Sequence, residues 1–516
     1  MVDLNRRHLL TALGGGAAAL AVGGCRSAAD SGQSSGASGE VLRLAQIADI
    51  QPQGLFSQNA NDFTVARLLF NSLTRYDHRT LEPRPELARE WRWSADRRRL
   101  TLRLREGVSF HSGREFTAAD VIASIRAQQD PKNTSQLINT AAAVTGLRAR
   151  GDHELELRLS RPVNNLFDLF ELMPVVDRKT LPGLLGGKQI IGTGPFRLKS
   201  WAAGDEAVLV RNPRYWRRGT PRLAGVRIRT IPQLQSLVAS LRTGQSDFVP
   251  GLAPADVAGL SGDKRFTTRF TDTRDNGWYL GVNVRKEAVK DRRTRQALSY
   301  AVDRERMAEV VFKGTAEPTS LPWPASSPAH RPELTGHYTH RPAKARKLLD
   351  EAGGAPRGPL RLAYNSSLPA TRYLAQIVQS DLAEVGVEVR LMPLLGADLG
   401  ARLGSGELPE LWINTHGFAH LHPASLVTGA KPFRYDANAS GYTGKEYAKA
   451  AETAWTATGA AAREAYDTLN SVLLREQFVI SLVQTGAAMT MTRRLKGLDW
   501  SMFDALDLDE ATLDAA

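Results

Sequence analysis

A histidine-rich segment, residues 415–423, carries the side chains in this sequence that are best suited to chemistry. It reads Thr-His-Gly-Phe-Ala-His-Leu-His-Pro and holds three of the ten histidines, His416, His420 and His422. His420 and His422 would share one face of a strand, and neutral imidazoles are good ligands for Ni²⁺, Cu²⁺ or Zn²⁺. Because the spacing matches no structural zinc motif, three roles stay open: contact with a metal or metal chelate, hydrogen bonding to a polar or anionic ligand, and a structural role.

Three other segments match catalytic or nucleotide-binding motifs only in part. Residues 32–36 have the GxSxG spacing of a hydrolase elbow, but they lie in a Ser/Gly-rich stretch without the required strand and helix. The run GLLGGKQ at 183–189 lacks the first glycine of a phosphate loop, and Gln189 stands where Mg²⁺ needs Ser or Thr. Residues 192–195 (GTGP) are too short for a dinucleotide fingerprint and predict a tight turn. The sequence therefore predicts no enzyme and no cofactor.

In the first half of the chain, alternating patterns indicate strands around one helix. Leucines alternate with polar residues at 100–105 and 154–159, which predicts two half-buried strands of one antiparallel sheet. Between them, residues 117–120 (TAAD) offer a capping-box-like start to a helix. Its inward positions would be Val121, Ile122 and Ile125.

The second half is richer in helices. One long helix is predicted over 291–312, stopped near Gly314, with inward residues Ala297, Leu298, Ala301, Val310 and Val311. Another is predicted over 343–352, ended by two glycines. Residues 360–395 have the order strand, helix, strand, which implies a parallel βαβ unit. The Pro-rich run 316–332 predicts an extended surface excursion. Mixed parallel and antiparallel parts predict an α/β protein with at least two lobes.

Composition and charge fit an ordinary globular protein better than a nucleic-acid-binding one. The chain has 516 residues, 42% of them hydrophobic and 23% charged, enough for two or three lobes. Its formal charge of +13 comes mostly from arginines spread along the chain beside acids. We interpret this as a solvated basic surface, with attraction to an anionic cell surface or ligand as the alternative.

The N-terminus predicts export and lipid anchoring. Arg6 and Arg7 precede an apolar stretch too short and Gly-rich to span a membrane, and Cys25 follows small residues. This resembles a twin-arginine signal peptide (1–24) that ends in a lipobox. Because Cys25 is the sole cysteine, no internal disulfide is possible, and lipidation explains it best. Residues 25–40 would be a flexible tether. The predicted location is the outer face of the cell membrane, on the periplasmic side if the host has an outer membrane.

Five landmarks in a fixed order resemble one family. They are the segments 85–91 (PELAREW), 100–121, 192–196 (GTGPF), 211–216 (RNPRYW) and 291–304 (DRRTRQALSYAVDR). Together they resemble bacterial extracellular solute-binding proteins of ABC importers, the oligopeptide, dipeptide and nickel type (family 5), over most of residues 41–510.

The resemblance implies a bilobal periplasmic-binding-protein-like α/β fold, type II and of the large cluster-C kind, with mixed sheets and an inserted subdomain. It places the first lobe at 41–82, 190–272 and 487–516, the inserted subdomain at 83–189 and the second lobe at 273–486. Hinge closure would bury a small polar ligand. The implied partners are that ligand, ABC permease and ATPase subunits, and the membrane through the lipid anchor only, with no nucleic acid. The protein would be a monomer.

The family's ligand-contacting segment falls on the histidine-rich stretch. Aligning on Pro423 puts Ala419 where peptide-binding members have an aspartate for the peptide's ammonium group. Without that carboxylate a buried ammonium would be uncompensated, which favours metal chelates, opine-like metallophores or modified peptides. The predicted ligand contacts are Trp412, His416, Ala419, His420 and His422, with Asn276, Trp278 and Tyr279 at the first crossing and Arg434 for a carboxylate. For each aromatic residue, core packing is the alternative.

Three hypotheses follow. The first is a binding protein that captures peptides or amino-acid-derived conjugates for a permease. The second is a binding protein for nickel or another transition-metal chelate, with His416, His420 and His422 near the metal. The third, from another class, is a secreted hydrolase or adhesive envelope protein, which only secretion and the basic surface suggest.

Overall fold

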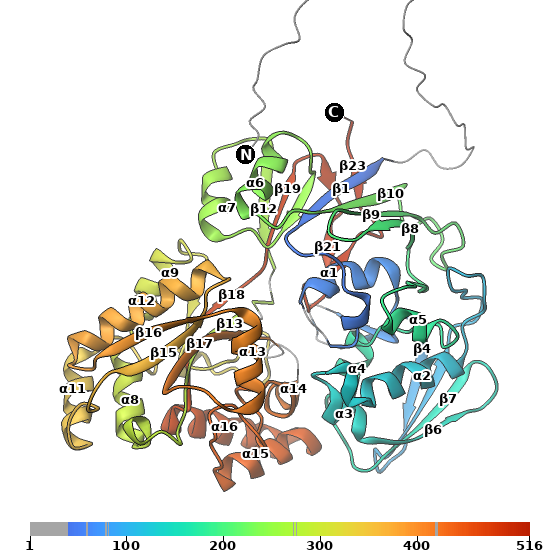
Figure 1. Ribbon diagram of the computed structural model, residues 1–516. Helices are drawn as coiled ribbons and strands as arrows, with labels where there is room; N and C mark the ends of the chain where they lie inside the picture. The colour runs from blue at the N-terminus through green and yellow to red at the C-terminus, as the bar shows by residue number, and fades with distance from the viewer. Residues whose placement is uncertain are drawn as a thin grey trace, which may run out of the picture. The chain divides into compact units, whose positions relative to one another are not determined.

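Two lobes, each built on its own large mixed sheet, make up the described part of the chain (Figure 1). The computed structural model describes residues 40–57, 60–77, 80, 82–271, 273–274, 276–417 and 422–515, with backbone only for 60–64. We name the lobes by their sheets; the residue boundaries predicted from the sequence remain predictions. The leader residues Arg6, Arg7 and Cys25 lie outside the described residues.

The first lobe contains a seven-stranded sheet. Its central strand β1 is parallel to β10 and β11, whereas β19 arrives from near the end of the chain and pairs antiparallel with both β11 and β12. In spatial order the strands are β12 (Phe266–Phe270), β19 (Ala488–Thr492), β11 (Phe248–Pro250), β1 (Val41–Gln46), β10 (Gly225–Thr230), β9 (Glu206–Arg211) and β8 (Phe196–Ala202).

A four-stranded antiparallel sheet is formed by the part of the chain between β1 and β8. Its order is β4 (Ala88–Trp93), β5 (Arg99–Leu104), β7 (Glu154–Leu159) and β6 (Val144–Ala149). The predicted pairing is confirmed, since Leu100 lies opposite Leu157 in antiparallel register. Helix α2 (Ala118–Gln129) starts at the predicted capping box, where the Asp120 carboxylate accepts from the Thr117 amide at 3.0 Å.

The second lobe contains a six-stranded sheet, in which β13 and β17 are central. The predicted βαβ unit is confirmed, because β15 and β16 are parallel and α12 connects them. In spatial order the strands are β14 (Glu317–Pro318), β18 (Val479–Thr485), β13 (Asn276–Val282), β17 (Leu411–His416), β15 (Leu360–Asn365) and β16 (Val389–Leu394).

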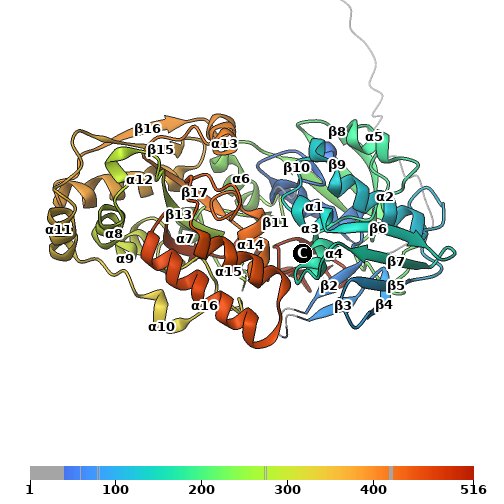
Figure 2. The same cartoon turned by 90° about the horizontal axis from the view of Figure 1, so that it is seen from below.

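Helices cover these sheets, and α15 and α16 run side by side at the lower edge of the second lobe (Figure 2). Those of the first lobe are α1 (Ala60–Leu69), α2, α3 (Ile138–Ala142), α4 (Leu166–Leu172), α5 (Leu181–Leu185), α6 (Leu234–Arg242) and α7 (Pro254–Leu260). Those of the second are α8 (Arg292–Ala301), α9 (Arg304–Val310), α10 (Pro332–Thr335), α11 (Pro342–Glu351), α12 (Pro369–Glu384), α13 (Gly396–Ser405), α14 (Pro423–Gly429), α15 (Lys445–Thr456) and α16 (Gly459–Glu476). No described helix has the length and apolar character needed to cross a membrane.

Two predictions for the second lobe are wrong. The helix expected over 291–312 is broken between α8 and α9, because Val302 is extended and the Asp303 carboxylate caps α9 by accepting from the Arg306 amide at 2.9 Å. Val310, expected inward, is 52% exposed. The Pro-rich run 316–332 is irregular but is not a surface excursion, because Trp323 is fully buried and its indole donates to the Asn470 side chain at 2.6 Å.

Two of the family landmarks meet in the first lobe. The backbone amide of Gly192 donates to Nδ1 of His111 at 3.2 Å, and Nε2 of His111 lies 3.1 Å from the Gly194 carbonyl. A Cβ on Gly192 would stand 1.9 Å from the Leu69 carbonyl oxygen. The glycine is therefore required by close backbone packing, and the histidine by the two main-chain groups that it bridges.

The chain passes between the lobes twice, from β12 to β13 and from β18 to β19. The two crossings lie beside each other, because the Thr271 amide donates to the Ala487 carbonyl at 3.0 Å and the Ala487 amide donates to the Thr271 hydroxyl at 2.8 Å. A Cβ on Gly486 would stand 2.4 Å from the Thr271 carbonyl oxygen. This pair of crossings is the covalent hinge between the lobes.

Candidate functional site

Two of the predicted ligand contacts lie in the core of the second lobe. Trp412, in the central strand β17, is fully buried, and its ring lies against Gly281 of β13, where a Cβ would be 2.1 Å from the indole. Its Nε1 lies 3.4 Å from the hydroxyl of Tyr279, which is also fully buried. Both aromatic side chains therefore fill the space over this sheet.

The histidines of the predicted segment occupy different places. His416 is 6% exposed and packs edge-on against Phe433, with ring centroids 4.8 Å apart. His422 caps α14 by accepting from the Ala424 amide at 3.2 Å, while its Nε2 lies 3.1 Å from the Tyr466 hydroxyl. Burial lowers the pKa of His422 to about 4, so the ring is neutral at pH 7.

The rest of that segment lies outside the described residues, including Ala419 and His420. Within the described ranges, no group of three or more His, Cys, Asp or Glu side chains is placed to hold a metal ion. Whether His416, His420 and His422 contact a metal chelate stays a prediction.

The remaining predicted contacts lie at the first crossing and beyond β17. Asn276 is exposed, whereas the Trp278 indole is buried and donates to the Thr485 hydroxyl at 3.1 Å, joining β13 to β18. Arg434 forms a two-pronged pair with Asp436, at 3.0 and 2.8 Å. A solute carboxylate at Arg434 would therefore have to share it with Asp436.

A charged cavity of about 870 Å³ lies beside the hinge. Its walls come mainly from the first lobe, but Thr273 of the first crossing and Ser326 of the second lobe also line it. The charged lining consists of Arg67, Arg75, Arg84, Arg217, Asp77, Glu171, Asp499 and Asp507. Four guanidinium groups thus face the same space as four carboxylates.

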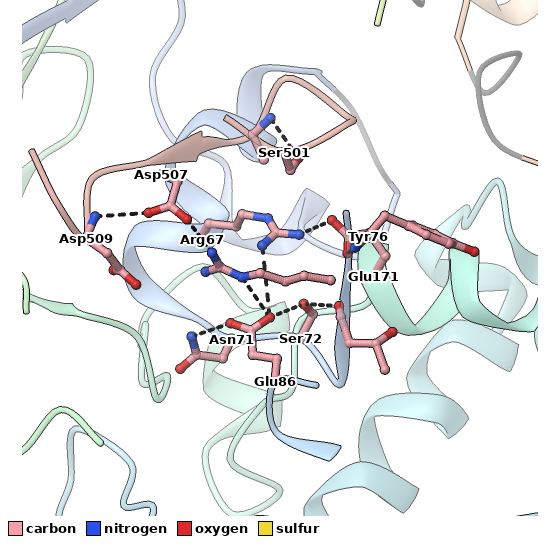
Figure 3. A network of polar contacts seen from close by, with 12 residues as sticks. Arg67, Asn71, Ser72, Tyr76, Glu86, Glu171, Ser501, Asp507 and Asp509 are labelled. Atoms are coloured by element: carbon pink, nitrogen blue, oxygen red, sulfur yellow. Dashed lines mark hydrogen bonds and ion pairs between the residues drawn. The ribbon is translucent and has the colours of Figure 1, made fainter. Parts of the chain in front are cut away.

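The arginines are held in fixed positions by buried acids (Figure 3). Arg75 pairs with Glu86 at 3.0 Å and with Asp507, and Arg67 pairs with Glu171 and lies 4.0 Å from Glu86. Glu86 also accepts from the side chains of Asn71 and Ser72, both at 2.8 Å. A cation in such a network is pre-oriented, so binding a polar solute costs little side-chain ordering.

The carboxylates of this network have opposite pKa shifts. Burial alone would raise the pKa of Glu86, but Arg75 and Arg67 lower it below its usual value. Burial raises the pKa of Glu171. Burial and the neighbouring Asp507 raise the pKa of Asp509, which pairs with Arg217 at 2.8 Å, to about 6. Glu171 and Asp509 are therefore protonated more readily than an exposed carboxylate, and Glu86 less readily.

None of the residues that line this cavity was among the predicted ligand contacts. Glu86 stood within a landmark segment and Arg67 and Arg75 lie just before it, yet Asp507 is 432 residues from Arg75. A single sequence has no pattern that links residues so far apart. Only the landmark around Glu86 could have drawn attention to this region.

Comparison with known proteins identifies the family. The family model of bacterial extracellular solute-binding proteins, family 5 (middle part), matches residues 82–427 of this chain. The glutathione-binding protein GsiB of Pectobacterium atrosepticum is 28% identical over 360 residues, 68% of each chain. The dipeptide-binding protein of Escherichia coli K12 is 25% identical over 410 residues, 72% of this chain and 75% of its own.

Solved structures share the fold. CtaP from Listeria monocytogenes, an ABC transporter substrate-binding protein, has a TM-score of 0.81 at 20% identity, covering 92% of this chain and 100% of its own. AgaA from Agrobacterium tumefaciens R10, solved with agropinic acid, has a TM-score of 0.80 at 21% identity, covering 92% and 99%. These likenesses establish the bilobal fold, and the match over residues 82–427 shows that this chain belongs to family 5 of the bacterial extracellular solute-binding proteins.

Proposed function

We propose that this protein captures a small peptide or an amino-acid-derived conjugate between its lobes and delivers it to an ABC permease. The observation that carries the proposal is the cavity of about 870 Å³, whose walls hold guanidinium and carboxylate groups side by side. Its volume is within the range of small-molecule sites. A peptide or conjugate carries both signs of charge, so it can match both kinds of wall group.

Both sides of the hinge contribute to this cavity, through Ser326 of the second lobe and Thr273 of the first crossing. Parting the lobes would therefore open one side of this cavity, and closure would complete its wall around a solute. The relatives of this chain include proteins named for binding glutathione and dipeptides. Glutathione and short peptides are accordingly the first solutes to test.

A thermal-shift series tests the proposal. Protein would be titrated with glutathione, dipeptides, tripeptides, an opine and nickel–histidine. A solute that binds the folded state raises the melting temperature as the solute concentration rises. At one hundred times the Kd, the free energy of unfolding increases by about 2.7 kcal/mol. The proposal predicts such a rise for at least one peptide or conjugate, abolished by Arg67→Gln or Arg217→Gln. A flat response to every peptide and conjugate would refute it.

The metal-chelate alternative has a separate signature. It predicts stabilisation by nickel–histidine but not by histidine alone, with loss of the effect in His416→Ala or His420→Ala. Unchanged nickel–histidine affinity in both variants would exclude a direct role for these imidazoles.

We further propose that the mature protein begins at an acylated Cys25 and that residues 25–40 tether it outside the cell. The leader sequence supports this, with Arg6 and Arg7 ahead of the apolar stretch. Mass spectrometry of the protein from membranes should find a lipid-modified N-terminal peptide. A peptide that starts upstream of Cys25 in the mature protein would contradict it.

A further inference from the structure

The two lobes also meet away from the hinge, through four buried side chains. Asn165 and Asp168 belong to the first lobe, at and within α4, whereas Ser425 of α14 and Trp455 of α15 belong to the second. None of the four is more than 3% exposed. We propose that these residues form an interlobe latch, which holds the lobes closed and fixes α14 against the first lobe. The role in solute capture rests on the function proposed above.

The hydrogen bonds of the latch form a chain in which each side chain donates to the next. The Trp455 indole donates to Asn165 Oδ1 at 2.8 Å, Asn165 Nδ2 donates to the Ser425 hydroxyl at 3.0 Å, and the Ser425 hydroxyl donates to Asp168. Asp168 also accepts from the Tyr76 hydroxyl at 2.7 Å. Three of these bonds cross between the lobes. Each donor has its own acceptor, so only one relative position of α14, α15 and α4 satisfies them all.

Further contacts surround the latch. The Asn164 backbone amide donates to the Trp455 carbonyl at 2.9 Å, which is a main-chain bond between lobes. The Arg161 guanidinium lies 4.1 Å from the centre of the Trp455 ring and pairs with Glu452. On the other side, the Asn139 side chain donates to the Thr428 carbonyl at 2.7 Å. The indole is thus covered from the first lobe on more than one side.

Polar and apolar contacts act together in the latch. All four side chains can hydrogen-bond to water when the lobes part, so each bond contributes only its net exchange free energy. Trp455, and Ala424 beside the latch, are also buried in the hydrophobic core of the first lobe, and this apolar burial opposes opening. The latch therefore biases the lobes toward closure.

The latch is placed to act on solute capture without touching the solute. Ser425 is three residues from His422, the end of the predicted ligand-contacting segment, and α14 begins at Pro423 between them. Fixing α14 on the first lobe therefore fixes one end of that segment. Among the described residues that line the charged cavity, none belongs to the latch. These are positioning residues.

Hydrogen exchange at the Asn164 amide of the full chain, without any added solute, measures lobe opening directly. This amide is protected only while its bond to the second lobe is formed. In Trp455→Phe the Asn165 oxygen loses its donor, and the exchange rate at Asn164 should rise about tenfold, with amides of β5 and β7 unchanged. Ser425→Ala, which removes a smaller group, should have the same effect if Trp455→Phe does not fold.

Trp323→Phe is the matched control. It also removes a buried indole donor from an asparagine oxygen, on Asn470, but both partners belong to the second lobe. It should lower overall stability and leave exchange at Asn164 unchanged relative to that of β5 and β7. The latch is refuted if Asn164 exchanges as fast in wild type as in Trp455→Phe, or if the control accelerates it equally. Because no solute is used, this result is independent of the thermal-shift test.

Discussion

Replacing Arg304, the last residue of the fifth landmark, should destabilise the second lobe strongly. Arg304 is 5% exposed, and within the described part of the chain none of the hydrogen bonds of its guanidinium goes to a carboxylate. Instead, its guanidinium donates to four main-chain oxygens and one hydroxyl. These are the carbonyls of Thr319 (3.2 Å), Ser481 (2.8 Å), Ser299 (2.9 Å) and Tyr338 (3.0 Å) and the hydroxyl of Ser299 (2.9 Å).

The magnitude follows from two opposing terms. In Arg304→Met, each of four buried carbonyl oxygens loses its donor at about 1–2 kcal/mol. Against this, the cost of burying the cation disappears; burial lowers the pKa of Arg304 from its usual value to about 10, which corresponds to about 3 kcal/mol. The Arg304 guanidinium remains charged at pH 7 with either its usual pKa or the lowered one. The net loss in the free energy of unfolding is therefore about 3 kcal/mol.

Urea unfolding at pH 7, followed by circular dichroism and tryptophan fluorescence, measures this loss. Arg304→Lys should recover part of it, because an ammonium group has three donors where the guanidinium uses all of its nitrogens. Arg357→Met, on an exposed arginine in the loop before β15, is the control and should stay within about 0.5 kcal/mol of wild type. If Arg304→Met also stays within that range, the argument from orphaned carbonyls is wrong.

Three further predictions concern the first lobe. Gly192→Ala should cost more than about 3 kcal/mol in urea unfolding, because its Cβ would meet a backbone oxygen at 1.9 Å, whereas Gly400→Ala in α13, with open space around it, should stabilise by about 0.5–1 kcal/mol. Burial lowers the pKa of His111 to about 4, below that of an unfolded histidine, so the free energy of unfolding should fall by about 2 kcal/mol as the pH drops from 7 to 5. In His111→Gln this part of the loss should vanish. A His111→Gln protein with the pH profile of wild type would disprove the role of His111. Burial raises the pKa of Asp509 to about 6, so ionisation of this carboxyl destabilises the fold above that pH. Asp509→Asn should therefore raise the free energy of unfolding at pH 8 by about 1–3 kcal/mol and lose this advantage at pH 4. Equal effects of the substitution at both pH values would argue against this role of Asp509.

Local patterns predicted much of the fold. The alternation at 100–104 and 154–159 gave a correct antiparallel pair, and the strand-helix-strand order at 360–395 gave a correct parallel one. The break between α8 and α9 was missed, because the apolar spacing continues through it and Asp303 shows its capping role only in three dimensions. The burial of 316–332 was missed because the partner of Trp323, Asn470, is 147 residues away.

The site was harder to predict than the fold. Trp412 stays a predicted ligand contact, but the full burial of its ring could not be read from the sequence, which does not tell that β17 is central in its sheet. The charged cavity depends on contacts of α1 and β2 (Thr74–Tyr76) with the C-terminal segment, which lies hundreds of residues further along the chain. Its charges also resemble the many exposed arginines of this chain. Only the fold distinguishes the buried arginines from the exposed ones.

The position of β19 in the first-lobe sheet governs the order in which the molecule can mature. Residues 276–485 are continuous, so a nascent chain can complete the second-lobe sheet before synthesis ends. The first-lobe sheet cannot be completed then, because β19 lies between β11 and β12 and is translated after the whole second lobe. A chain arrested at residue 486 would leave these two strands without their common neighbour. The first lobe can thus close its sheet only after the second lobe has been synthesised.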